Sequence, residues 1–269
     1  MEVRQMNRID KTLNELKSRG EKALITFVTA GDPDLETTEE LVLKMFESGS
    51  DIVEIGVPFS DPVAEGKIIQ EASLRSLAHG TNLTKIFGTV ENLRQKTDKP
   101  ILLMMYVNTI FRFGTESFFR LCREKGVDGV IVPDLPFEER DEIRSFADDN
   151  GIIPISLVAP TSHQRIESIA SDARGFLYCV SSTGVTGTRN SFSTDFNEFF
   201  SEVKKSCKVP AMVGFGISNP EQAAEMSVYC DGIIVGSAIV DIVGKHGKDS
   251  IQKVGEFVRS LKDAIVSPK

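Results

Sequence analysis

Short apolar segments alternate with amphipathic segments along almost the whole chain, and this rhythm restricts the fold more than any other feature of the sequence. The apolar segments have the length and composition of buried strands, whereas the segments between them repeat apolar residues at helical spacing. Strands that alternate with helices form parallel sheets in which each helix crosses back over the sheet. The predicted strands are residues 23–29, 52–56, 100–106, 129–132, 153–158, 175–180, 210–213 and 232–235.

Eight strand–helix units in a chain of 269 residues predict an α/β fold, a (β/α)8 TIM barrel. An extra N-terminal helix, Asn7–Arg19, precedes the first strand and has Gly20 as its stop signal. No linker or low-complexity tract interrupts the pattern, so we expect a single TIM-barrel domain over residues 1–269. An open, doubly wound parallel sheet is the alternative. Other predicted helices are residues 68–78, 83–93, 116–124, 138–148, 164–170, 194–206 and 251–265.

The charge balance limits the classes of partner that the chain is suited to bind. It has 39 acidic and 31 basic residues and a formal charge of −8, which argues against nucleic acid or an anionic membrane. A small anionic substrate stays compatible with this charge, because helix N-termini and backbone N–H groups bind anions locally.

The cysteines and histidines show no spacing typical of a disulfide framework or a metal site. We therefore expect reduced cysteines, no metal ion and a cytoplasmic location. The first residues lack the apolar segment of a signal peptide, and no apolar run is long enough to span a bilayer. The residues concerned are Cys122, Cys179, Cys207, Cys230, His79, His163 and His246.

The segment from Asp51 to Gly66 holds the strongest candidates for catalysis. Its strand places Glu54 on the same face as Ile52, and both faces of a parallel strand are normally buried. A carboxylate in that setting is costly unless it is paired or used in chemistry. Asp61 and Glu65 follow in the loop, so three carboxylates lie close together and suggest acid/base catalysis. A turn residue and a solvated charge are the simpler interpretations of the last two.

The loops that follow the strands of such a barrel meet at one end, where active sites lie. Gly216 and Gly236 follow the seventh and eighth strands, the usual phosphate position, and Ser237 adds a hydroxyl and an amide. Ordinary turn glycines explain either position alone. Aromatic residues near strand ends can line a flat pocket beside the phosphate, although each alone is as readily a core residue. These aromatic residues are Phe27, Tyr106, Tyr178 and Phe215.

One longer motif is specific enough to indicate a family. Residues 54–66 read Glu-Ile-Gly-Val-Pro-Phe-Ser-Asp-Pro-Val-Ala-Glu-Gly and closely resemble the signature of the tryptophan synthase alpha subunit family. Further segments resemble the same family in the same order, although the glycine turns alone are shared with many phosphate-binding barrels. These segments are residues 27–33, 182–187, 214–218 and 236–240.

The resemblance implies a lyase of tryptophan biosynthesis that cleaves indole-3-glycerol phosphate to indole and glyceraldehyde 3-phosphate by a retro-aldol reaction. Glu54 matches the general acid/base, which protonates indole C3 and removes the glycerol hydroxyl proton. Glu65 matches the second carboxylate, which holds the indole N–H as positive charge develops. The family's phosphate and loop positions match Thr186, Gly187, Gly216, Gly236 and Ser237.

The resemblance also implies a partner protein. Asp134 and the loop that carries Asp61 match the face that docks a PLP-dependent beta subunit in an alpha-beta-beta-alpha complex. That partner receives indole through a tunnel and holds the cofactor, so none is implied for this chain. Tyr178 matches a tyrosine near the catalytic glutamate. The family's indole pocket matches Phe27, Tyr106 and Phe215.

Two residues depart from the family pattern. Glu65 stands where the family usually has Asp, and Lys67 stands where it usually has Pro. The extra methylene moves the carboxylate by roughly 1.5 Å, and a misplacement of that size costs on the order of a hundredfold in rate unless the loop compensates. Lys67 either forms a salt bridge that occupies Glu65 or points into water, and we expect the second.

Three functions are therefore compared. The first is an active lyase working as an alpha subunit. The second is a catalytically weakened barrel that acts mainly as an activator of the beta subunit, and only Glu65 and Lys67 support it. The third is another metal-free barrel acting on sugar phosphates, such as an isomerase, against which the aromatic pocket and the Glu54 motif argue. We favour the first.

Overall fold

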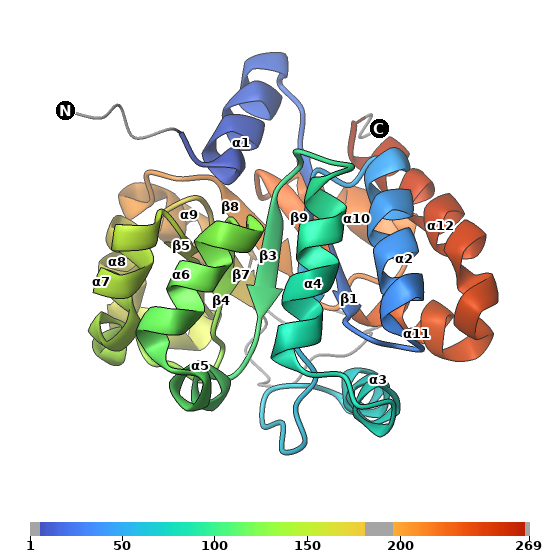
Figure 1. Ribbon diagram of the computed structural model, residues 1–269. Coiled ribbons are helices and arrows are strands. Elements are labelled where there is room, and N and C mark those ends of the chain that lie inside the picture. Colours follow the sequence, from blue (N-terminus) through green and yellow to red (C-terminus); the bar gives the residue numbers. More distant parts are fainter. Residues whose placement is uncertain (1–5, 181–195, 267–269) are drawn as a thin grey trace.

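Parallel strands form a barrel that is surrounded by helices (Figure 1). The computed structural model describes residues 6–180 and 196–266. Neighbouring strands run in the order β5-β4-β3-β2-β1-β9-β8-β7-β6, and all the described pairs are parallel. The strands are β1 (Ala23–Thr29), β2 (Ile52–Gly56), β3 (Ile101–Met104), β4 (Gly129–Ile131), β5 (Ile153–Pro154), β6 (Ser156–Val158), β7 (Leu177–Val180), β8 (Ala211–Gly214) and β9 (Gly232–Val235).

Helices connect each strand to the next and surround the barrel, apart from α1, which precedes the first strand and lies at one end. They are α1 (Arg8–Arg19), α2 (Leu35–Glu47), α3 (Lys67–Ala78), α4 (Leu83–Arg94), α5 (Val107–Phe113), α6 (Thr115–Lys125), α7 (Asp141–Asn150), α8 (Ile166–Asp172), α9 (Phe196–Ser206), α10 (Pro220–Ser227), α11 (Ser237–His246) and α12 (Ser250–Val266). Short 3-10 turns cover Phe137–Glu139, Pro160–Arg165 and Gly247–Asp249. The predicted TIM barrel with an extra N-terminal helix is confirmed.

The fifth predicted strand, residues 153–158, is divided into β5 and β6 at Ile155. β5 pairs with β4, and β6 pairs with β7, so this divided strand closes the ring. The N–H of Ile155 still donates to the carbonyl oxygen of Val130 at 2.9 Å. Pro154 has no N–H to give to a ladder, which fits a break at this point.

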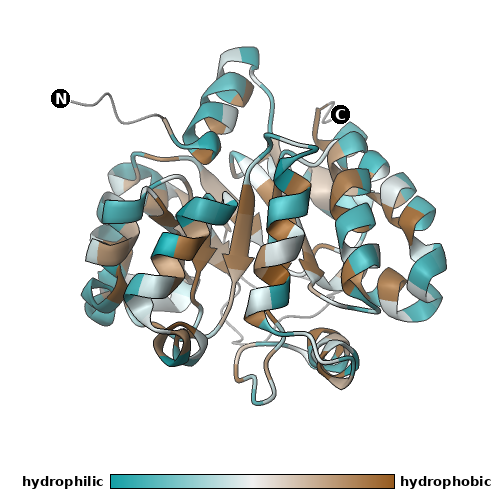
Figure 2. Cartoon of the chain, in the orientation of Figure 1, coloured by the Kyte–Doolittle hydropathy of each residue, from teal (hydrophilic) through white to brown (hydrophobic). Residues whose placement is uncertain are grey.

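Each strand separates two hydrophobic layers, because successive side chains point to opposite faces. Ile25 and Ile52 belong to the cluster inside the barrel, whereas Val53 and Ile55 belong to the larger cluster beneath the helices. Figure 2 shows the same division, with apolar strands at the centre and helices whose hydrophilic sides face outward. Glu54 therefore points into the barrel together with Ile52, as its alternation predicted.

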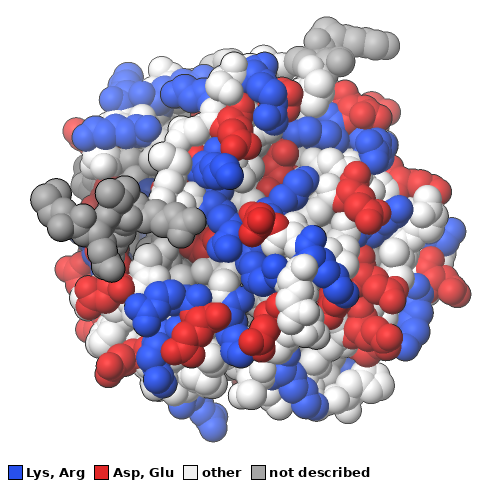
Figure 3. Space-filling model, turned by 45° about the horizontal axis from the view of Figure 1, so that its top comes forward, with Lys and Arg blue, Asp and Glu red and all other residues white. Residues whose placement is uncertain are grey.

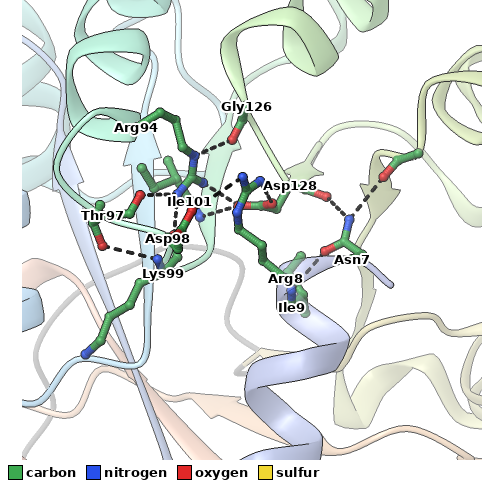
Figure 4. A network of polar contacts seen from close by, with 11 residues as sticks. Asn7, Arg8, Ile9, Arg94, Thr97, Asp98, Lys99, Ile101, Gly126 and Asp128 are labelled. Atoms are coloured by element: carbon green, nitrogen blue, oxygen red, sulfur yellow. Dashed lines mark hydrogen bonds and ion pairs between the residues drawn. The ribbon is translucent and has the colours of Figure 1, made fainter. Parts of the chain in front are cut away.

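The first helix closes one end of the barrel. Ile9, Leu13 and Leu16 of α1 join the inner cluster, and Gly20 ends the helix with a positive φ of 67°. A polar network ties the start of α1 to loops that enter β4 and β5 (Figure 4). In it Asn7 donates to the carbonyl oxygens of residues 128 and 151 at 2.9 and 3.0 Å. The carboxyl ends of the strands therefore form the open end, which we call the mouth.

Asp128 is the centre of that network and is only 3% exposed. Its carboxylate accepts hydrogen bonds from Arg8 at 3.0 Å, from Arg94 at 2.5 Å and from the N–H of Ile101 at 2.9 Å. Two cations and a backbone donor thus compensate the buried charge. Figure 3 shows acidic and basic side chains interspersed over the face seen there, in keeping with the modest net charge of −8.

One helix of the structure was not predicted. α5 follows β3 almost directly, and Gly114, with a φ of 93°, separates it from α6. Its first N–H, that of Val107, donates to Asp134 Oδ1 at 2.9 Å, so the cap comes from a residue 27 positions away. A local sequence pattern cannot reveal a cap that comes from so distant a residue. The predicted strand 100–106 therefore extended beyond Met104, where β3 ends.

Candidate functional site

Glu54 is a buried carboxyl group near the end of β2. Its exposed fraction is 0%, and neither of its oxygen atoms has a hydrogen-bond partner among the described residues. Burial away from water raises the pKa of Glu54 to about 8. A carboxylic acid in this environment is protonated at neutral pH and can release its proton, which suits a general acid that later acts as a base.

Tyr178 lies close to Glu54 inside the barrel. It belongs to the inner cluster and is 9% exposed. Burial, together with the nearby charge of Glu54, raises the pKa of the Tyr178 phenol well above its ordinary value. A Cβ added at Gly214, on the neighbouring β8, would lie 2.5 Å from the ring, so glycine at that position leaves room for the tyrosine.

Glu65 is held by Tyr106. The Tyr106 hydroxyl donates to Glu65 Oε2 and accepts hydrogen bonds from the N–H groups of Val63 and Ala64, both at 2.9 Å. The ring of Phe59 stacks on Tyr106 with centroids 4.9 Å apart. One buried tyrosine therefore fixes both the second candidate carboxylate and the loop between β2 and α3.

The pKa of Glu65 is raised, chiefly because burial disfavours its charged form, and the nearby charge of Asp134 acts in the same direction. Lys67 does not occupy this carboxylate. Its side chain is 87% exposed and pairs with Glu71, one turn further along α3, at 3.7 Å. The expected solvent-facing orientation of Lys67 fits these positions.

Phe27 lies beside Glu54, because the two residues are opposite each other in the pairing of β1 with β2. A Cβ added at Gly56 would lie 2.4 Å from the Phe27 ring, and one added at Gly236 would lie 3.3 Å from the Phe27 Cβ. The ring consequently packs between the ends of β2 and β9. The hydroxyl of Thr29 follows on the same face of β1 and is buried without a partner among the described residues.

The glycine turns after β8 and β9 lie at the mouth. Gly216 has a φ of 73°, a left-handed conformation that glycine adopts at low cost. Gly236 precedes α11, whose first residue, Ser237, is 9% exposed. The N–H groups of the first turn of a helix are suited to bind an anion. Two further predicted phosphate residues, Thr186 and Gly187, lie outside the described residues.

The remaining predicted residues have different surroundings. Phe215 belongs to the outer cluster and packs edge-on against Phe196 of α9, with centroids 5.2 Å apart. Its predicted place in the indole pocket stays a prediction. Asp61 is exposed in the loop that projects from the mouth. Asp134 is half-buried and caps α5.

Sequence reasoning missed two contributors to this site. The Thr29 hydroxyl had a usable signal, since residues 25, 27 and 29 alternate onto one face of the first strand. Phe59 had no such signal, because its contact with Tyr106 depends on how a proline-containing loop folds.

Comparison with known proteins adds independent information. The sequence pattern of the family described as "Tryptophan synthase alpha chain" matches residues 13–266. The tryptophan synthase alpha chain of Thermoanaerobacter sp. strain X514 is 48% identical over 262 residues, which cover 97% of this chain and 100% of that protein. The corresponding chain of Citrifermentans bemidjiense is 48% identical over 263 residues, covering 97% and 98%.

Solved structures give the same result. The structure of tryptophan synthase subunit alpha from Legionella pneumophila str. Paris has a TM-score of 0.86 and 37% identity, covering 97% of this chain and 98% of that one. A chain in the tryptophan synthase complex from Pyrococcus furiosus has a TM-score of 0.83 and 34% identity, covering 90% and 98%. The family pattern covers residues 13–266, the relatives match over almost the whole chain, and the chain therefore belongs to the tryptophan synthase alpha chain family.

Proposed function

We propose that Glu54 and Glu65 carry out the alpha reaction of this family in the mouth of the barrel. The chain is a lyase of tryptophan biosynthesis, and the reaction cleaves indole-3-glycerol phosphate to indole and glyceraldehyde 3-phosphate. The observation that carries the assignment is Glu54, a fully buried carboxyl group with no partner among the described residues and a pKa of about 8.

Glu54 has two roles in the proposed mechanism. Its carboxylic acid first donates a proton to C3 of the indole ring, which leaves positive charge on the ring nitrogen. The resulting carboxylate then takes the proton of the glycerol hydroxyl adjacent to the ring. As that C–O–H becomes a carbonyl, the C–C bond breaks, and its electron pair returns to the indole and neutralises the nitrogen. The proton balance closes, because Glu54 ends the cycle protonated.

Glu65 stabilises the intermediate. As a carboxylate it accepts a hydrogen bond from the indole N–H and offsets the positive charge that develops on the ring nitrogen. Tyr106 keeps this group in place. The aromatic rings of Phe27 and Tyr178 border the site, and the turns at Gly216 and at Gly236 with Ser237 are proposed to bind the phosphate.

A weakened barrel that only activates a partner is not favoured. Its support was Glu65, where the family usually has Asp, and Lys67 as a competing partner of that carboxylate. Lys67 pairs with Glu71 instead, and Glu65 is held by Tyr106. The sequence motif extends through both carboxylates, and the relatives that match over their full length are alpha chains. An active lyase therefore accounts for the site.

The beta subunit of tryptophan synthase is the proposed partner, in an alpha-beta-beta-alpha complex like the solved complex from Pyrococcus furiosus. The exposed loop with Asp61 and the segment with Asp134 are proposed to form the docking face at the mouth. Pyridoxal phosphate would be held by that partner, and this chain needs no cofactor of its own for the proton transfers described. We further propose a single domain and a cytoplasmic location, in keeping with four free cysteines.

No helix among the described residues has both the length and the apolar composition needed to cross a membrane.

The test is indole release from indole-3-glycerol phosphate, measured with and without a tryptophan synthase beta subunit. Slow release alone and a large acceleration with the beta subunit are expected, because loops at barrel mouths close on association. No release in either condition, combined with faster condensation of serine and indole by the beta subunit, would instead establish an activator. Tight binding of simple sugar phosphates without any preference for indole-bearing ones would favour an isomerase.

A further inference from the structure

A cavity of about 400 Å³ lies outside the barrel wall, beneath α7 and α8. Its volume falls within the range of small-molecule sites. Neither Glu54 nor Glu65 lines it, but it reaches the mouth at Asp134, whose charge acts on Glu65. Its apolar lining comes from β4, β5, the loop after β4 and the two helices, and includes Val130, Val132, Leu135, Ile143, Pro154 and Ile169.

The cavity exists because the sheet opens beside it. β4 pairs with β5 as far as Val130, whereas β6 pairs with β7 in the described ladders and not with β4. Beyond Ile155, β4 and β6 are therefore not paired with each other. Ile155 and Leu157, which pack with the inner cluster, consequently also line this outer cavity.

Two arginines at the cavity share a single carboxylate. Arg144 binds both oxygens of Asp172, at 2.9 and 3.1 Å. Arg140 Nε lies 3.2 Å from Asp172 Oδ2, but the group is not oriented for a hydrogen bond, and this buried N–H has no acceptor among the described residues. The cluster therefore keeps one unsatisfied donor, which is unfavourable without a further acceptor.

The other charges around the cavity define how much negative charge it tolerates. Arg165 pairs with Glu138 at 3.2 Å, and Arg174 pairs with Asp148, so these rim pairs are balanced. Asp134 also lines the cavity and contributes a negative charge. Asp134 and Asp172 together balance Arg140 and Arg144, so the lining is neutral overall. An anion is therefore favoured only locally, at the unsatisfied Arg140 Nε–H, and a dianion would be repelled by the two carboxylates.

We propose that this cavity binds a small monocarboxylate with an apolar body. The carboxylate accepts a hydrogen bond from Arg140 Nε–H, and the apolar body fills the space against Val132, Ile143 and Ile169. Charge-assisted bonds to guanidinium are the natural means of fixing a carboxylate in an otherwise apolar pocket. This proposal goes beyond the alpha reaction and does not depend on the roles of Glu54 and Glu65.

The first experiment titrates the whole chain with 3-phenylpropionate and, separately, with its uncharged analogue 3-phenylpropanamide. Calorimetry gives the affinity, and the NMR signals of the arginine Nε–Hε groups report the contact. We expect a Kd on the order of 1 mM for the acid and a shift of the Arg140 signal. The amide should bind at least about tenfold more weakly, because it lacks the charged acceptor.

Matched variants locate the ligand. Arg140→Gln should weaken 3-phenylpropionate binding by about tenfold or more. Ser156→Leu, on the outward face of β6, should abolish it by filling the cavity while leaving every charge in place. Arg123→Gln, an exposed position on α6, is the control and should leave the affinity unchanged.

Four results would overturn the proposal. They are an absence of binding to the unaltered chain, equal affinity for acid and amide, equal affinity in Ser156→Leu, and displacement of the probe by indole. The last result would place the probe in the barrel mouth. A fifth is inorganic phosphate binding as tightly as 3-phenylpropionate, which would show that the apolar body contributes nothing.

Discussion

Tyr106 and Glu65 are joined across 41 positions of sequence by a hydrogen bond from the phenol to the carboxylate. The same phenol oxygen accepts the N–H groups of Val63 and Ala64. The longer side chain at position 65, compared with the usual Asp of the family, therefore has a partner that fixes its position. This contact explains how the chain can tolerate the departure.

Removing the phenol should reduce catalysis without unfolding the barrel. Tyr106→Phe keeps the buried ring but frees Glu65 and the loop, so the kcat for indole release should fall by about tenfold while KM changes less. Steady-state kinetics with the beta subunit present measure this. Tyr229→Phe, a tyrosine that packs against Phe200 far along the chain, is the control. Equal losses in both variants would show that Tyr106 has no particular role.

Shortening the second carboxylate to the usual family residue should not improve the enzyme. Glu65→Asp draws the carboxylate away from Tyr106 by about the length of one C–C bond, and we expect the rate to fall by roughly tenfold to a hundredfold. Glu71→Asp, at the partner of Lys67, serves as the matched control. A rate equal to or above that of the unaltered chain would show that the Tyr106 contact is dispensable.

Replacing the buried acid should remove the chemistry. Glu54→Gln preserves shape but has no transferable proton, so indole release should fall by at least about a hundredfold. Activation of the beta subunit should survive, because the substitution is buried inside the barrel. Indole release at a normal rate would show that another group is the acid/base.

The same substitution should change how stability depends on pH. The pKa of Glu54 is about 8 in the folded chain against an unfolded value of 4.5, so the folded state holds more protons between these values. The contribution of Glu54 to the free energy of unfolding therefore falls as pH rises. From pH 5 to pH 8 the free energy of unfolding should fall by on the order of 3 kcal/mol more in the unaltered chain than in Glu54→Gln. Denaturant titrations at several pH values measure the difference, and parallel curves would contradict it.

The network under α1 should contribute strongly to stability. Asp128→Ala leaves Arg94 and the N–H of Ile101 without their shared acceptor, so the free energy of unfolding should fall by about 3 kcal/mol. Asp98→Ala is the control, because Asp98 is 97% exposed and lies 3.8 Å from Arg8. Urea unfolding of both variants tests this, and similar small losses would show that burial of Asp128 matters little.

The sequence was sufficient for the barrel because the decisive information is local. Apolar runs and helical spacing identified the strands, and alternation along β2 placed Glu54 inside. The family motif then indicated the function, and the match over residues 13–266 confirms the family.

Features that depend on distant partners were not predictable in the same way. The cap that Asp134 gives to α5, and the hold of Tyr106 on Glu65, join segments whose approach is set by the closed barrel. Phe215 illustrates the opposite problem. Its place after a strand suggested the substrate pocket, whereas its ring packs against Phe196, which the sequence did not predict, and its contact with substrate stays a prediction. The opening between β4 and β6 similarly depends on a break that only pairing reveals.

The helix α1 determines where substrate and products can enter and leave the barrel. Because Ile9, Leu13 and Leu16 fill the amino-terminal end of the barrel, the interior communicates with its surroundings on one side. Substrate and both products must then enter and leave through the same open end of the barrel. A protein bound over this opening would receive the products as they leave the barrel. Closure of the opposite end by α1 therefore favours transfer of a small apolar product to a bound partner over its release into solvent.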